Sequence, residues 1–166
     1  MQLAVIEVAR HVVRLKGAHT FEVNKDTPHP VIDVNPEQKE NIKSQRYGGT
    51  LRLGAYACRL VPGTKARGAY KQPLISERHR HRYEYNNEYK AQLEKAGLLV
   101  SGVNPESDLV EIVELAKHPW FVGVQFHPEF KSRPLRPHPL FRDFIGASLK
   151  HKRNRGKNTA CFAYFQ

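Results

Sequence analysis

The amino-terminal residues place apolar side chains at helical spacing. Between Leu3 and Leu15 they recur every three or four residues, at Val5, Ile6, Ala9, Val12 and Val13. This spacing predicts a helix, and we expect Gly17 to stop it. The next stretch, Asn24–Arg46, is rich in Pro, Asn, Lys and Glu apart from the apolar Val31–Val34, which predicts a loop with one short strand.

In the middle of the chain the pattern changes to alternation. The segment Gly48–Leu60, GGTLRLGAYACRL, alternates apolar and polar positions around Gly54, which predicts two strands joined by a turn or a bulge. A short helix is expected over Thr64–Tyr70. Beyond the densely charged Ile75–Tyr85, the sequence NNEYKAQLEKAG has a helical period that ends at Gly97.

The remaining residues predict three short strands and a closing helix. The strand candidates are Leu98–Ser101, Leu109–Leu115 and Trp120–Phe126, and the last is almost wholly apolar, as in a strand buried on both faces. A helix over His138–Leu149 carries one apolar stripe, at Leu140, Phe141, Phe144, Ile145 and Leu149. Strands and helices that alternate without strict order predict an α/β layered domain with a mixed sheet.

Length and composition narrow the class of protein. With 166 residues, 40% of them hydrophobic, the chain is expected to form one globular domain. Its apolar runs fall far short of the roughly 20 residues of a membrane span. The opening residues contain Glu7 and Arg10 and do not resemble a signal peptide. Two cysteines, Cys58 and Cys161, suggest no disulfide framework, so a cytoplasmic protein is expected.

About half of the formal net charge of +11 belongs to the end of the chain. The last 17 residues hold five of the 27 basic residues and no acid, so the rest of the chain carries 22 basic (27 − 5) and 16 acidic residues. We interpret residues 150–166 as a solvated, disordered basic tail. The alternative is a tail that binds nucleic acid through the release of counterions.

The segment His118–Phe130, HPWFVGVQFHPEF, carries the strongest chemical signal. Its apolar strand delivers His127 and Glu129 at a carboxyl end, where the sites of layered α/β domains gather. A neutral imidazole can take up a proton near pH 7, and a carboxylate can fix its tautomer and stabilise the imidazolium. Taken alone, the triplet also fits a His and a Glu that only satisfy loop hydrogen bonds.

Longer motifs decide between these alternatives. HPWFVGVQFHPEF resembles the His and Glu motif of class I, or triad-type, glutamine amidotransferases. GGTLRLG, ERHRHRYEYNN and RPHPLF accompany it in the order seen in the CTP synthase family. The resemblance covers about Met1–Leu149. It implies the carboxyl-terminal part of an α/β glutaminase domain whose amino-terminal portion is missing from this sequence.

The resemblance implies catalytic roles. In the family a cysteine thiolate attacks the side-chain amide of glutamine, and a His assists proton transfer to the leaving ammonia. His127 would be this base and acid, and Glu129 would orient it. The family's cysteine stands on a tight turn resembling CLGMQ, and Met1-Gln2 matches its end. The nucleophile would therefore precede Met1, and we expect Cys58 to be a small buried apolar group.

The resemblance also implies a receptor for glutamine, made by Gln2, Glu22, Arg82 and Tyr83. Glu22 matches an acid that binds the amino group of the substrate, and Arg82 with Tyr83 matches the RYE segment that lines the pocket. An acid facing an ammonium group and an Arg facing a carboxylate would suit a free amino acid. The sequence departs from the family at Phe21, where Thr is usual, and at Leu51, where Met is frequent.

The run ERHRHRYE admits two further interpretations. His79 and His81 could bind a metal ion, but no Cys or acidic ligand stands at a convincing distance in the sequence, so no metal is expected. Arg78, Arg80 and Arg82 could bind an acidic partner or phosphate, because on an extended strand they share one face. The resemblance places this run within the glutaminase domain and so favours a role in packing and in communication with the synthetase domain.

Partners follow from the resemblance as well. CTP synthases make CTP from UTP with ATP and glutamine-derived ammonia. ATP and magnesium are thus implied for the synthetase domain, and no cofactor is implied for this chain. The implied partners are L-glutamine, the synthetase domain and further copies in a homo-oligomer, with no membrane or nucleic acid. The alternative function is a noncatalytic module that docks on a complete CTP synthase.

Overall fold

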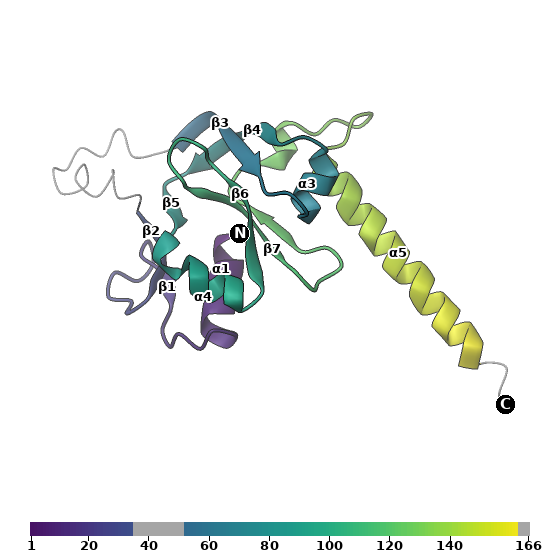
Figure 1. Cartoon of the computed structure of the whole chain (residues 1–166), viewed down its shortest axis with the longest axis horizontal. Helices are drawn as coiled ribbons and strands as arrows, with labels where there is room; N and C mark the ends of the chain where they lie inside the picture. Colours follow the sequence, from purple (N-terminus) through teal and green to yellow (C-terminus); the bar gives the residue numbers. More distant parts are fainter. Residues whose placement is uncertain (35–51, 163–166) are drawn as a thin grey trace.

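The computed structural model describes residues 1–34 and 52–162, and its strands form two sheets (Figure 1). The larger sheet has the order β4-β3-β6-β7-β8 with antiparallel neighbours, and the smaller, β1-β2-β5, pairs β1 parallel and β5 antiparallel to β2. The α/β class and the mixed sheet are therefore confirmed. The strands are β1 (His19–Thr20), β2 (Pro30–Val34), β3 (Arg52–Leu60), β4 (Leu74–His81), β5 (Tyr83–Tyr85), β6 (Leu98–Val103), β7 (Val110–Leu115) and β8 (Val122–Val124).

Helices cover both faces of the larger sheet. The α-helices are α1 (Gln2–His11), α3 (Lys65–Tyr70), α4 (Lys90–Lys95) and α5 (Pro139–Phe162), and two 3₁₀ turns are η2 (Asn87–Tyr89) and η3 (Pro128–Phe130). One core contains buried side chains of α1 and α4, and the other contains those of α3 and the first turn of α5. Ile112 and Val113, neighbours in β7, belong to different cores because successive side chains of a strand face opposite ways.

Local signals explain where α3 begins and where the chain turns after α1. The side chain of Thr64 accepts a hydrogen bond from the backbone N–H of Arg67 and so caps α3. Helix α1 ends at His11 rather than at the predicted Leu15, and the chain turns through a positive φ of 69° at Arg14 before Gly17. The short strand predicted over Val31–Val34 is confirmed as β2.

The prediction of two strands around Gly54 is wrong within the described residues. Strand β3 is continuous, because β4 pairs with it from Arg52, opposite His81, to Arg59, opposite Leu74. Gly54 keeps its place in this ladder with a φ of 103°, a conformation that glycine adopts without a steric penalty. The preceding residues 48–51 lie outside the described part of the chain.

The strand predicted over Trp120–Phe126 is shorter and less buried than expected. Only Val122–Val124 form β8, and all three residues are half-buried because β8 is an edge strand of the described sheet. Beside it, an apolar groove of about 400 Å³ lies between β8 and α5, lined by residues that include Val124, Phe141 and Phe144.

Only the first turn of helix α5 packs into the core. Leu140 is buried, but the other members of the predicted stripe are 41% to 55% exposed. The helix leaves the body of the molecule (Figure 1) and extends past the predicted end at Leu149. The division of the chain at Leu149 into domain and tail stays a prediction. None of the helices in the described ranges has the length and apolarity of a membrane span.

Gly102 of β6 leaves room for side chains of the two neighbouring strands, β3 and β7, to pack closely over it. A Cβ atom at Gly102 would lie 2.7 Å from both Cys58 Sγ and Ile112 Cγ1. We expect Gly102→Ala to lower the free energy of unfolding by about 1–3 kcal/mol, because the core must shift to admit the methyl group. Chemical denaturation measures this change. The control Gly146→Ala, in α5 with open space around it, should raise stability by about 0.5–1 kcal/mol.

Candidate active site

His127 and Glu129 form a hydrogen-bonded pair directly after β8. His127 Nδ1 lies 2.7 Å from Glu129 Oε1, and the imidazole stacks on the ring of Phe130. The backbone N–H of His127 donates to the carbonyl of Arg78 in β4, which fixes the pair against the larger sheet. Since Glu129 engages Nδ1, the contacts of the described residues leave Nε2 free to exchange a proton.

The electrostatics of the pair favour an ionised Glu129. Burial alone would raise the pKa of this carboxyl group. Hydrogen bonds from its own backbone N–H and from His127, with the charges of His127 and His138, outweigh burial and bring the pKa below the ordinary value. The side chains of His127 and Glu129 are 37% and 55% exposed, so solvent reaches the imidazole. The arrangement suits proton transfer to a group that approaches from outside.

The four residues expected to bind glutamine line a single cavity of about 420 Å³. Gln2 comes from the first turn of α1, Glu22 follows β1, Arg82 lies in the bend between β4 and β5, and Tyr83 begins β5. Arg80 and His81 complete the lining. Residues from three segments far apart in sequence thus converge, whereas His127 and Glu129 are not part of this lining.

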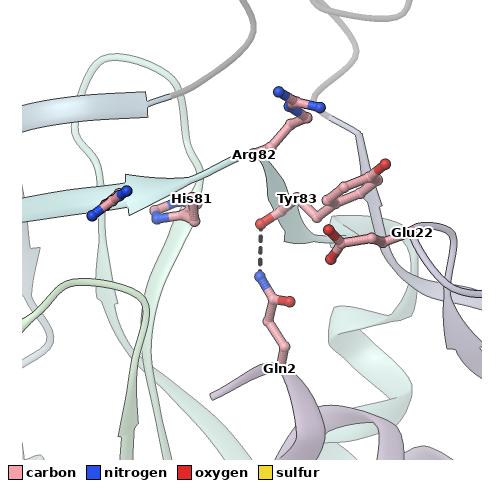
Figure 2. A pocket seen from close by; sticks show the side chains of 6 residues that line it. Gln2, Glu22, His81, Arg82 and Tyr83 are labelled. Atoms are coloured by element: carbon pink, nitrogen blue, oxygen red, sulfur yellow. Dashed lines mark hydrogen bonds between the residues drawn. The ribbon is translucent and has the colours of Figure 1, made fainter.

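Figure 2 shows how the polar groups of this cavity are directed. The carboxylate of Glu22 and the side-chain oxygen of Gln2 point toward the same space, and the guanidinium of Arg82 lies at the opposite rim. Gln2 Nε2 donates to the backbone carbonyl of Tyr83, 2.9 Å away. The cavity therefore presents hydrogen-bond acceptors on one side and a cation on the other.

Gln125 connects this cavity to the His–Glu pair. Its side chain is buried and accepts a hydrogen bond from Gln2 Nε2 at 3.3 Å. It also donates to the carbonyl of Tyr83 and to Glu84 Oε2, each at 3.1 Å. Because Gln125 stands two residues before His127, the cavity and the imidazole are joined by a short covalent and hydrogen-bonded path.

Comparison with known proteins agrees with this geometry. Residues 1–147 match the family model described as Glutamine amidotransferase class-I. The chain belongs to this family. The resemblance to class I glutamine amidotransferases noted from the sequence motifs is confirmed.

Relatives of this chain among the class I glutamine amidotransferases include CTP synthases. The chain is 63% identical over 150 residues to CTP synthase of Moorella thermoacetica and of Carboxydothermus hydrogenoformans, matching 90% of this chain in each case. It spans only 27% and 28% of the length of these two relatives. A solved structure, the glutaminase domain of Trypanosoma brucei CTPS with bound acivicin, superposes with a TM-score of 0.82 at 38% identity, covering 90% of this chain and 57% of that one.

Beneath the cavity of this class I domain lies a buried network of charges. Arg52 donates to Glu84 Oε1 at 3.2 Å and to Glu111 Oε1 at 2.7 Å, and His81 Nε2 lies 2.9 Å from Glu84 Oε1. Burial opposes the charge of Arg52, but the two carboxylates raise its pKa overall. Arg52 therefore neutralises two acids that have almost no contact with water.

The histidines of β4 have a structural role in this network. His79 is buried, and the loss of hydration together with the charges of Arg52, His81 and His127 lowers its pKa to about 3, so the ring is neutral. Its Nδ1 lies 3.5 Å from Glu111 Oε2. Among the described residues no group of three or more His, Cys, Asp and Glu side chains is arranged to hold a metal ion.

The strand prediction for this run is only partly right. Arg78 and Arg80 are exposed and His79 is buried on the other face of β4, as alternation requires. Arg82 does not continue that face, because the chain bends between β4 and β5. Arg80 and Arg82 both line the cavity, one from β4 and the other from the bend.

Cys58 lies away from both parts of the site. Its side chain is fully buried in the core beside Ile112 and Phe126. Burial, followed by the charges of Glu111 and Glu77, raises the pKa of the thiol to about 12, so the nucleophilic thiolate is scarce near neutral pH. The side chain of Cys161 lies outside the described part of α5.

Sequence reasoning missed three residues of the site. Arg80 and His81 line the cavity, and Gln125 bridges it to His127. A signal for Gln125 was present, since it stands inside the motif HPWFVGVQFHPEF, two residues before His127. No comparable signal identifies His81, because its exposure to the cavity depends on where β4 ends.

Proposed function

We propose that this chain is the glutamine-hydrolysing part of a CTP synthase and supplies ammonia for the ATP-dependent conversion of UTP to CTP. One observation carries the proposal: a cavity with the polarity of an amino acid receptor is hydrogen-bonded to the strand that ends in a His–Glu pair. The high identity to CTP synthases supports the choice of this enzyme among class I amidotransferases.

In this proposal the cavity binds L-glutamine by the ammonium and carboxylate groups on its α-carbon. Glu22 and the Gln2 side-chain oxygen accept hydrogen bonds from the ammonium group, and Arg82 pairs with the carboxylate. Tyr83 supplies the wall between them. The side-chain amide of the substrate then extends toward His127, where the reaction takes place.

His127 handles the protons of the reaction. It accepts the proton of the attacking thiol and delivers one to the leaving nitrogen, so that ammonia departs and an acyl-enzyme forms. It next takes a proton from water, which attacks the acyl group and releases glutamate. Glu129 holds Nδ1 and stabilises the imidazolium in each step.

Among the described residues we infer no sulfur nucleophile for the reaction. Cys58 is buried in the core, where its raised pKa makes the thiolate scarce. We therefore expect the isolated chain to hydrolyse L-glutamine no faster than background. Turnover lost on Cys58→Ser or Cys161→Ser would identify that cysteine as the nucleophile, and turnover surviving both changes would reveal another one.

The remaining partners are proposed by analogy with the same enzymes. ATP and magnesium would act in the synthetase domain. We further propose a cytoplasmic location and assembly of the whole enzyme as a homo-oligomer.

A domain exchange tests the proposed function. The 150-residue segment of the Moorella thermoacetica enzyme that matches this chain is replaced by the corresponding residues of this chain. The hybrid should form CTP from UTP, ATP and L-glutamine at a rate comparable to the parent. A hybrid that folds and uses ammonium ions, yet cannot use glutamine, would contradict the proposal.

A further inference from the structure

We infer that Gln125 is a positioning residue that makes the cavity selective for the α-ammonium group of its ligand. The inference rests on the proposed function, because it concerns how the same cavity recognises L-glutamine. Gln125 is not among the residues that line the cavity, and the neighbour through which it acts on the ligand is Gln2.

The hydrogen bonds of Gln125 fix the orientation of its amide. Its nitrogen faces two acceptors, the carbonyl of Tyr83 and the carboxylate of Glu84, each at 3.1 Å. A flipped amide would place its oxygen against both acceptors and lose both hydrogen bonds. Glu84 cannot turn away, because its other oxygen holds Arg52 and His81.

This fixed orientation determines which end of Gln2 faces the ligand. The oxygen of Gln125 and the carbonyl of Tyr83 both accept from Gln2 Nε2, at 3.3 and 2.9 Å. The nitrogen of Gln2 is thereby held inward, and its oxygen points into the cavity on the side of Glu22 (Figure 2). Without Gln125, the Gln2 amide could rotate and present N–H groups, which repel an ammonium ion.

Two ligands separate this role from a general structural one. L-Glutamine and glutaramate, the same molecule without its α-ammonium group, are titrated against the full 166-residue chain by isothermal calorimetry. The wild type should prefer L-glutamine. In Gln125→Met this preference should fall by about tenfold, the size of one hydrogen bond to a charged group, while the affinity for glutaramate changes by no more than about twofold.

Matched variants sharpen the test. Gln92→Met removes an exposed glutamine on α4 and should leave both affinities unchanged. In a Gln2→Met background, adding Gln125→Met should have no further effect on the preference, because the residue acts through Gln2. Should Gln125→Met not fold, Gln125→Asn replaces it, since the shorter amide cannot reach Gln2 and Glu84 together.

The outcomes distinguish this inference from the proposed function. A wild-type chain that binds neither ligand contradicts the proposed receptor itself. Binding with an unchanged preference in Gln125→Met overturns only the inference, and so does an equal loss of affinity for both ligands, because that result indicates a structural role.

Discussion

Replacing Arg52 by methionine is expected to lower the free energy of unfolding by about 3–5 kcal/mol. The guanidinium is the shared partner of Glu84 and Glu111, both almost fully buried. Methionine fills much of the same space but leaves Glu111 without its hydrogen-bond donor and Glu84 without its cation, in a medium that solvates charge poorly. Denaturant unfolding at neutral pH measures the change, and Arg59→Met, at an exposed position of the same strand, is the control.

The pH dependence of the Arg52→Met variant follows from the sign of the Glu111 shift. Burial raises the folded-state pKa of Glu111, whereas Arg52 lowers it, and burial prevails. A carboxyl group whose pKa is raised by folding binds more protons in the folded state than in the unfolded state. Stability therefore falls as the pH rises from the unfolded-state pKa to the folded-state pKa. Without Arg52 the folded-state pKa of Glu111 rises further, so this interval widens. The loss of unfolding free energy in Arg52→Met should therefore be smaller at pH 5 than at pH 8. A deficit independent of pH would contradict the role assigned to the ion pairs.

The second large effect is expected at His127 in the hybrid CTP synthase. His127→Asn should reduce glutamine-dependent CTP formation by about 10³-fold, because asparagine cannot take up the proton that the imidazole carries. CTP formation from added ammonium ions should be unchanged, since it bypasses glutamine hydrolysis. Initial rates with each nitrogen source provide the measurement.

Two controls accompany this experiment. His118→Asn, at an exposed position before β8, should leave both rates unchanged. Glu129→Gln should reduce the glutamine-dependent rate less than His127→Asn, since it removes the orienting charge but retains the imidazole. Equal loss of the glutamine and ammonium rates in His127→Asn would show that the variant damages the enzyme as a whole.

The sequence predicted the local elements that depend on residues close together in the chain. Helix α3, strand β2 and the closeness of His127 to Glu129 all follow from short-range spacing. The continuous β3 was missed because a glycine inside a strand usually signals a break. Pairing with β4 along its whole length, a long-range feature, keeps Gly54 in the ladder.

The sequence named part of the candidate site, but not how its residues assemble. Motif resemblance named Gln2, Glu22, Arg82 and Tyr83, and the fold brings them to one cavity. The buried network around Arg52 gave no sequence signal, because a charged residue in an alternating strand reads as a solvent-facing position. The sequence also could not predict that the apolar stripe on α5 is exposed, because periodicity indicates an apolar face but not which element packs against it.

The central claim is that this chain builds the receptor for L-glutamine, and its most direct test is an NMR titration of the backbone amide signals of the full chain. Addition of L-glutamine should shift the signals of Gln2, Glu22, Arg82 and Tyr83 saturably, with little change around Cys58. An absence of shifts at millimolar glutamine, or shifts confined to residues far from this cavity, would contradict the account.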